Sequence, residues 1–198
     1  MYSKAVITKL SDEKILVKRY YPNGQLKFKS PLNEMANELL GKANGTEITL
    51  ENYATKKQVH GSKDGLVSWW YENGKKSWEA TFKNGKPDGK FTHWNENGQI
   101  ISEINYKNGK KYGKWTLWYE NGQRKSEINY KNYKEDDKLT WFESRQSGNK
   151  DGKSTWWYEN GKIKSEGNWK DDKRNGKWTT SFKNGKIKSE ENYQNERA

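Results

Sequence analysis

The sequence predicts an all-β protein: an elongated, twisted antiparallel β-meander in a single sheet, built from 24-residue β-hairpin repeats, with one short N-terminal helix. Asn-Gly pairs recur 24 residues apart, and a second series of glycines keeps the same step. In addition, 14% of the 198 residues are aromatic although only 30% are hydrophobic. The chain therefore has too many rings for a disordered protein and too few aliphatic residues for an ordinary core.

The two periodic series define the repeat array. The Asn-Gly pairs are Asn73-Gly74, Asn97-Gly98, Asn121-Gly122, Asn160-Gly161 and Asn184-Gly185, and the second series is Gly65, Gly89, Gly113, Gly152 and Gly176. The 24-residue spacing of both series is interrupted once, where residues 136–149 are interpreted as a truncated unit. The array is therefore expected to span residues 61–198.

Residues 1–60 are expected to hold a divergent first repeat and a capping segment. The run Tyr-Tyr-Pro-Asn-Gly-Gln at 20–25 aligns with Trp-Tyr-Glu-Asn-Gly-Gln at 118–123, so the first hairpin begins near residue 15. A short helix is predicted at 33–40, because Met35, Leu39 and Leu40 share one side and Gly41 follows as a stop signal. This helix would cap the first edge of the sheet.

Each Asn-Gly pair is expected to form a two-residue type I′ turn between two strands. Such a turn fixes the register of the hairpin. On one face the predicted pairs are Gly113–Tyr130, Trp115–Ile128, Leu117–Ser126 and Tyr119–Arg124. On the other face they are Lys114–Asn129, Thr116–Glu127 and Trp118–Lys125. The same count sets a glycine opposite an aromatic residue in every repeat, which we interpret as a ring lying across bare backbone.

The two faces differ in composition. The first, expected to be packed, carries Val67, Trp69, Ala80, Phe91, Ile104, Trp115, Leu117, Ile128, Trp156 and Trp178. The second carries a tryptophan column (Trp70, Trp94, Trp118 and Trp157), a lysine column (Lys90, Lys114, Lys153 and Lys177) and a glutamate column (Glu79, Glu103, Glu127, Glu166 and Glu190). We expect the glutamates to form solvated cross-strand pairs.

Residues 113–132, Gly-Lys-Trp-Thr-x-Trp-Tyr-Glu-Asn-Gly-x-x-Lys-Ser-Glu-x-x-Tyr-Lys-Asn, closely resemble the bacterial MORN-repeat variant, the group often labelled YwqK-family antitoxins. The resemblance covers residues 61–196 well and 15–60 loosely. It implies a non-catalytic β-sheet repeat protein that binds another macromolecule, in some members a toxin encoded beside it. Other relatives are exported or surface proteins, so an adhesion or envelope-binding role is the alternative. Tyr133 departs from the pattern, which has glycine there.

The residues offer little for an enzyme, so no catalytic, cofactor-binding or metal site is predicted. Cysteine is absent, and the only histidines are His60 and His93. His93 falls on the packed face, where we interpret it as a half-buried substitute for an aromatic residue rather than a general base. No nucleotide-binding or nucleophile motif occurs.

The predicted partner-binding residues are Trp70, Trp94, Trp118 and Trp157 with Lys90, Lys114 and Lys153. An aromatic ladder bordered by lysines suits an interface, because aromatic residues dominate interface hot spots; the alternative is that the rings only stabilise the sheet by stacking. A protein partner is favoured, and the net charge of +12 suggests that it is an acidic protein, such as a toxin. Nucleic acid is disfavoured because the glutamates lie beside the same rings, while a membrane or glycan surface stays open.

The compartment is weakly constrained. No run of about 18 apolar residues occurs, so no transmembrane helix is predicted. The start of the chain lacks the features of a signal peptide, which predicts a cytoplasmic protein as written. Removal of a signal peptide would instead be consistent with a cell-envelope or secreted protein.

Overall fold

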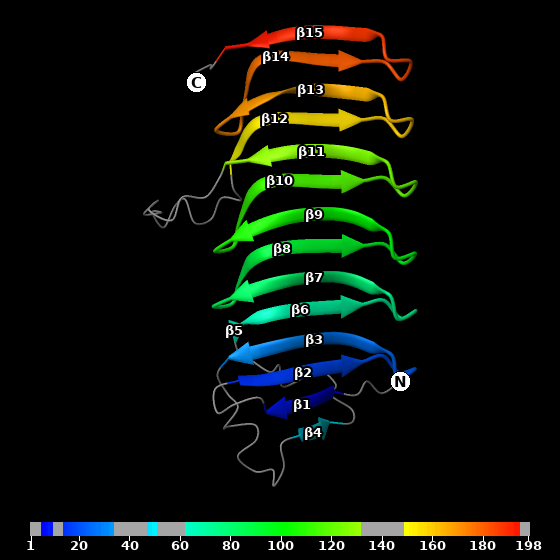
Figure 1. Cartoon of the computed structure of the whole chain (residues 1–198), viewed down its shortest axis with the longest axis vertical. Coiled ribbons are helices and arrows are strands. Elements are labelled where there is room, and N and C mark those ends of the chain that lie inside the picture. Colours follow the sequence, from blue (N-terminus) through cyan, green and yellow to red (C-terminus); the bar gives the residue numbers. More distant parts are fainter. Residues whose placement is uncertain (1–4, 10–13, 34–46, 51–61, 132–148, 195–198) are drawn as a thin grey trace. The chain divides into compact units, whose positions relative to one another are not determined.

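The computed structural model describes residues 5–9, 14–33, 47–50, 62–131 and 149–194. Backbone hydrogen bonds join the strands of these residues into one antiparallel sheet (Figure 1). The strands are β1 (Ala5–Lys9), β2 (Lys14–Tyr20), β3 (Leu26–Asn33), β4 (Glu47–Leu50), β5 (Ser62–Lys63), β6 (Gly65–Trp70), β7 (Lys76–Lys83), β8 (Lys86–Trp94), β9 (Ile100–Lys107), β10 (Lys110–Trp118), β11 (Arg124–Tyr130), β12 (Lys150–Trp157), β13 (Ile163–Lys170), β14 (Lys173–Ser181) and β15 (Ile187–Tyr193). The predicted all-β, single-sheet, antiparallel architecture is confirmed.

The chain divides into two compact units. The first comprises Met1–Gly89 and His93–Gly98, and the second comprises Lys90–Thr92 and Gln99–Ala198, so β8 contributes residues to both. In the first unit the strand order is β7-β6-β3-β2-β1-β4, with β5 also paired to β3. In the second unit the strands from β9 to β15 follow one another in sequence order as a meander. The described residues include no helix long and apolar enough to cross a membrane.

The predicted N-terminal helix at 33–40 is wrong. Asn33 is the last residue of β3, where it lies opposite Lys14 of β2 and Ser62 of β5. The β2–β3 ladder thus includes Asn33, the residue at which the helix was expected to begin. The described ranges contain no helix, and residues 34–40 lie outside them. Strand β4 pairs with β1, at the edge that the helix was expected to cap.

The hairpin turn at Asn121-Gly122 is also not the predicted two-residue type I′ turn. The Tyr119 N–H donates to the Gln123 carbonyl (2.8 Å), and the Gly122 N–H donates to the Tyr119 carbonyl (3.0 Å). Gly122 has φ +81°, whereas Asn121 is not among the residues with positive φ. This is a three-residue loop, a type I turn closed by a left-handed glycine. The Asn121 side chain favours it, because its Oδ1 accepts the Gln123 N–H at 3.0 Å.

A bulge restores the register that the longer loop would otherwise shift. Trp118 lies opposite Arg124 rather than Lys125, but Leu117 lies opposite Ser126 as predicted. The extra residue is therefore Lys125, and from Leu117 to Gly113 every predicted pair of this hairpin is confirmed. The same shift follows the corresponding turns in the β2–β3, β6–β7, β12–β13 and β14–β15 hairpins.

True type I′ geometry occurs instead in the turns that join one repeat to the next. Both central residues have positive φ at Asn84-Gly85, Asn108-Gly109 and Asp171-Asp172. The flanking residues pair directly, as Lys107 does with Lys110 and Lys170 with Lys173. Where the structure describes the connections of the repeat array, three-residue loops within repeats alternate with two-residue loops between them.

The periodic glycines lie opposite aromatic residues, but not for the expected reason. Gly113 pairs with Tyr130, yet a Cβ added to Gly113 would meet no atom within 4 Å. Its φ is +66°, and the β9–β10 register shifts between Tyr112 and Thr116. The glycine is needed because the strand bends there in a conformation that disfavours side chains, not because a ring occupies the space.

Packing in each unit centres on a small cluster. In the first unit Ile7, Ile15, Val17, Phe28 and Val67 are buried, and Trp69, Trp78 and Phe82 pack on them. In the second unit Ile104, Ile128 and Tyr130 are buried beneath Phe91, Tyr106, Trp115 and Trp156. Residues predicted for the packed face are therefore buried or half-buried. Aromatic rings pack over the small clusters, a role that aliphatic side chains have in other proteins.

Side chains at the three-residue loops form hydrogen bonds to the backbone of the neighbouring repeat. The amide Nδ2 groups of Asn23, Asn73, Asn121 and Asn160 donate to the carbonyls of Glu72, Glu96, Glu159 and Lys183. A tyrosine lies two residues before each of these asparagines, and its hydroxyl also donates to a backbone carbonyl of the next repeat. The donors are Tyr21, Tyr71, Tyr119 and Tyr158, and the acceptors are Trp70, Trp94, Trp157 and Ser181. Each loop is thus held both by its own hydrogen bonds and by the loop beside it.

Replacing Asn160 with aspartate is expected to lower the free energy of unfolding by about 1–2 kcal/mol. Aspartate keeps the acceptor for the Lys162 N–H (3.1 Å) but turns the 2.8 Å bond to Lys183 into an oxygen–oxygen contact. Urea unfolding followed by tryptophan fluorescence measures the loss. Asn184→Asp is the matched control: its Oδ1 accepts the Lys186 N–H, and the described part of the chain gives its Nδ2 no acceptor. Equal losses would contradict this role.

Candidate functional site

The tryptophan column lies near the strand ends that lead into the three-residue loops. Trp70 ends β6, Trp94 ends β8, Trp118 ends β10 and Trp157 ends β12. All four side chains are half-buried. The carbonyls of Trp70, Trp94 and Trp157 accept the tyrosine hydroxyl bonds described above, which anchors the backbone beneath these rings. Burial and the nearby Glu159 raise the pKa of Tyr119, so its hydroxyl remains a protonated donor.

The column rings do not stack on one another. Trp94 has Lys76 over its ring at 5.8 Å, but no ring–ring contact involves any of the four within the described part of the chain. The packed face is different, since Trp69 stacks with Trp78 at 5.9 Å, and Trp156 lies 5.8 Å from Trp178. Stacking along the column, the structural alternative considered for these residues, is therefore not observed.

Open hollows adjoin two members of the column. In the first unit a hollow of about 450 Å³ is lined by Leu16, Lys29, Pro31, Leu66, Ser68, Trp70, Lys76 and Glu79. In the second unit a hollow of about 590 Å³ is lined by Ile101, Leu117, Trp118, Tyr119, Glu120, Asn121, Lys125 and Glu159. Both combine apolar and aromatic walls with charged groups, and Leu66 is 52% exposed. Each hollow has a column tryptophan in its wall.

The lysine column is paired with the glutamate column. Lys90 contacts Glu103 at 2.6 Å, and Lys153 contacts Glu166 at 2.8 Å. Lys114 lies 3.3 Å from Glu127, whose other oxygen is 3.3 Å from Arg124. These are exposed pairs that contribute little stability. The predicted cross-strand pairing of the glutamates is confirmed, and the three predicted lysines do not stand beside the tryptophans as uncompensated cations.

The structure brings together no catalytic constellation among the residues it describes. His93 is half-buried at the expected position, and burial lowers its pKa, so the imidazole is neutral at neutral pH. His60 lies outside the described residues. No group of three or more metal-ligating side chains occurs within them.

The hydrogen bonds between neighbouring loops were not predicted, although a sequence pattern accompanies them. A Tyr-Glu-Asn-Gly run follows Trp70, Trp118 and Trp157, but the sequence pattern predicts only a turn for its asparagine. The structure gives the Asn121 side chain two tasks, closing its own loop and donating to the Glu159 carbonyl at 3.1 Å. Pairing of an amide side chain across repeats requires knowledge of how loops lie side by side, which a single hairpin does not reveal.

Comparison with known proteins identifies a repeat family. The family model described as MORN repeat variant matches six segments, residues 15–34, 63–84, 87–108, 111–132, 150–171 and 174–195. No curated protein matches the chain. Among solved structures, a porin-like protein from Bacteroides uniformis ATCC 8492 is similar at 12% identity and a TM-score of 0.21, over 91% of this chain; the chain spans 59% of that protein's length. The six matched repeats cover most of the sequence, and the chain belongs to the MORN repeat variant family.

Proposed function

We propose that this protein is a non-catalytic repeat protein that binds a protein partner through the tryptophan column and the hollows beside Trp70 and Trp118. The observation that carries the proposal is the contrast between the two faces. Tryptophans of the packed face are held in ring clusters, whereas Trp70, Trp94, Trp118 and Trp157 are half-exposed and have no ring partner in the described part of the chain.

Interface energetics support this use of the column. Binding energy is concentrated in a few aromatic anchors that fill pockets, and a polar rim around them excludes water. Here the tyrosine–carbonyl bonds already fix the backbone beneath the rings, so a partner would lose little additional backbone entropy on binding. Ion pairs such as Lys114–Glu127 (3.3 Å) supply a charged border that is locally neutral.

In its finer form, the proposal is that the partner is a toxin and the protein its antitoxin. This rests on the resemblance of residues 113–132 to YwqK-family antitoxins, and the net charge of +12 fits an acidic partner. The gene beside the one for this protein tests it. Co-expression should abolish the toxicity of the adjacent gene product; a harmless neighbour, or recovery of cell-envelope material alone, would contradict the antitoxin form and favour the adhesion alternative.

The Trp94→Ser/Trp118→Ser variant is expected to weaken partner binding by about 30-fold or more, since loss of even one anchor costs about 2 kcal/mol. Affinity purification with the intact chain supplies the partner, and titration calorimetry measures the affinity. The melting temperature should stay within a few degrees, because the rings are not part of the buried clusters.

Phe182→Ser is the matched control. It removes an aromatic ring that is 49% exposed but lies outside the column, so partner affinity should be unchanged. A large loss of thermal stability in the tryptophan variant with affinity retained would show that the column is structural and would overturn the proposal.

A further inference from the structure

A second surface of the second unit alternates cations with aromatic rings across successive strands. We call it the cation–aromatic row, and it consists of Lys111, Tyr130, Lys150, Trp169, Arg174 and Tyr193. Its cations come from β10, β12 and β14 and its rings from β11, β13 and β15. Lys111 lies over the ring of Trp115, three residues before Trp118 of the tryptophan column. Side chains an odd number of residues apart in a strand point to opposite faces, so Trp115 and Trp118 lie on opposite faces of the sheet. The row is therefore separate from the column.

Backbone register and ring contacts both define the row. Tyr130 lies directly opposite Lys150, and Trp169 directly opposite Arg174. The Lys111 ammonium is 4.1 Å from the centre of Trp115 and 5.6 Å from that of Tyr130. That of Lys150 is 4.4 Å from the centre of Trp169. These contacts hold the long side chains in place.

The Arg174 guanidinium continues the pattern at the last hairpin. It lies 4.4 Å from the centre of Trp178 and 5.1 Å from that of Tyr193, whose hydroxyl it contacts at 2.6 Å. Tyr193 in turn donates to Glu191, so this end of the row is partly compensated. Among the described residues of the row, Lys111 and Lys150 are the cations without such compensation.

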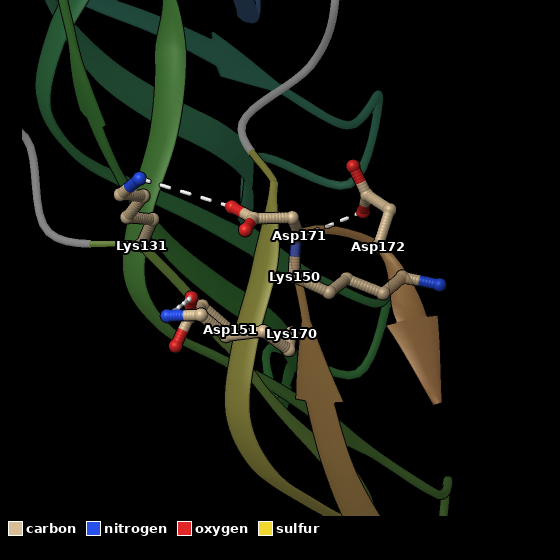
Figure 2. Close-up of polar contacts among 6 residues, drawn as sticks. All are labelled: Lys131, Lys150, Asp151, Lys170, Asp171 and Asp172. Atoms are coloured by element: carbon tan, nitrogen blue, oxygen red, sulfur yellow. Dashed lines mark hydrogen bonds and ion pairs between the residues drawn. The ribbon is translucent and has the colours of Figure 1, made fainter. Parts of the chain in front are cut away.

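The aspartates near Lys150 contact groups other than its ammonium (Figure 2). Asp171 contacts Lys131 at 3.8 Å and Asp151 contacts Lys170 at 3.3 Å. Asp172 accepts the backbone N–H of Lys150 at 2.8 Å, while the Lys150 ammonium extends away from the two ion pairs. In the described ranges neither the Lys111 nor the Lys150 ammonium has a carboxylate at ion-pair distance.

Lys111 and Lys150 are both half-buried. Burial, with repulsion from Lys150 as the smaller cause, lowers the pKa of Lys111. Two ammonium groups held on neighbouring hairpins, of which that of Lys111 is partly desolvated, favour the approach of an anion. Such an anion would gain more here than from freely moving surface lysines, because no side-chain order has to be created on binding.

The spacing of the cations and the lysines that lie over the rings indicate which kind of anion fits. Successive cations are two strands apart, which is about 9.5 Å. An extended chain advances about 9.3 Å in three residues of polyproline II conformation and then presents the same side again. Lysines over Trp115 and Trp169 already cover those rings, which disfavours a nucleic acid whose bases need open ring faces for stacking.

We propose that the cation–aromatic row binds an extended acidic protein segment that carries a carboxylate on every third residue. Successive carboxylates would lie between neighbouring cations, with the site between Lys111 and Lys150 the strongest. This surface is additional to the tryptophan column and does not depend on it.

Two peptides of equal composition and charge test the spacing directly. Glu-Pro-Pro-Glu-Pro-Pro-Glu presents its carboxylates on one side about 9.3 Å apart, whereas Glu-Glu-Glu-Pro-Pro-Pro-Pro clusters them. Titration calorimetry of the full chain at low ionic strength should show about tenfold or tighter binding of the spaced peptide. Equal affinities, or no binding of the spaced peptide, would overturn the proposal.

Lys111→Gln/Lys150→Gln should weaken binding of the spaced peptide at least tenfold, and Lys111→Arg/Lys150→Arg should retain it. The control Lys183→Gln/Lys186→Gln removes the same charge from exposed positions of the second unit and should change affinity less than threefold. Equal effects of the two glutamine variants would reduce the site to net-charge attraction and contradict the proposal, as would tighter, lysine-dependent binding of a single-stranded oligonucleotide. Circular dichroism verifies folding of each variant.

Discussion

Replacing Trp178 with alanine is expected to lower the free energy of unfolding by about 3–5 kcal/mol. Trp178 is 3% exposed, and three rings surround it: Trp156 at 5.8 Å, Trp169 at 5.3 Å and Tyr193 at 6.3 Å. Its indole N–H also donates to the Asn168 carbonyl at 3.0 Å. Alanine would leave a cavity between three strands and an unused acceptor.

Urea unfolding followed by far-ultraviolet circular dichroism measures this loss. The matched control is Trp157→Ala, which removes the same side chain from the half-buried column of the same unit and should cost clearly less. Similar losses for the two variants would mean that the column carries as much packing energy as the core, against the division of roles between the two faces.

Changing Gly167 to alanine is expected to destabilise the protein by about 1–3 kcal/mol. The usual effect has the opposite sign: where backbone angles suit alanine, the change stabilises by about 0.4–1 kcal/mol. Gly167 does not have a positive φ, but an added Cβ would overlap the indole ring of Trp178. The ring would have to leave its place among Trp156, Trp169 and Tyr193.

A double-mutant cycle with Trp178→Val tests the cause. In the valine background the ring is gone, so Gly167→Ala should then cost little or become favourable. Thermal unfolding of the four proteins gives the coupling. If Gly167→Ala destabilised both backgrounds equally, the overlap with Trp178 would not be the reason for glycine at this position.

The sequence predicted the register of the hairpins through two errors that cancel. A type I′ turn at Asn121-Gly122 and the observed three-residue loop differ by one residue, and the bulge at Lys125 removes that difference. Pairs beyond Leu117 are therefore right, while those of Trp118 and Tyr119 with the facing strand are not. An Asn-Gly pair fits both turn types, and in the observed loop the Asn121 side chain accepts the Gln123 N–H.

The glycines show a similar limit. Periodicity singled out Gly113, where backbone conformation rather than ring contact requires glycine. The glycine that does lie beneath a ring, Gly167, occupies a position filled by isoleucine in the repeats of β9 and β11, so no periodic signal marks it. Its role follows from the indole of Trp178 on the neighbouring strand, which a repeat alignment does not place.

For the candidate site, the tryptophan column could be predicted because it depends only on the repeat phase. The free charge could not be assigned in the same way. Lys90, Lys114 and Lys153 pair with glutamates, whereas within the described ranges Lys111 and Lys150 lie over aromatic rings and have no carboxylate at ion-pair distance. Their phase, two residues before the glycine, was visible in the sequence, but their contacts depend on the bend at Gly113 and Gly152.

Hydroxyl-radical footprinting of the protein with and without its purified partner tests the central claim, that the tryptophan column is the binding surface. Oxidation of Trp70, Trp94, Trp118 and Trp157 is expected to fall several-fold on binding, because each half-exposed ring would be covered. Trp115 and Trp178, on the packed face, should react equally in both states. Unchanged oxidation of the column in a saturated complex would contradict the account.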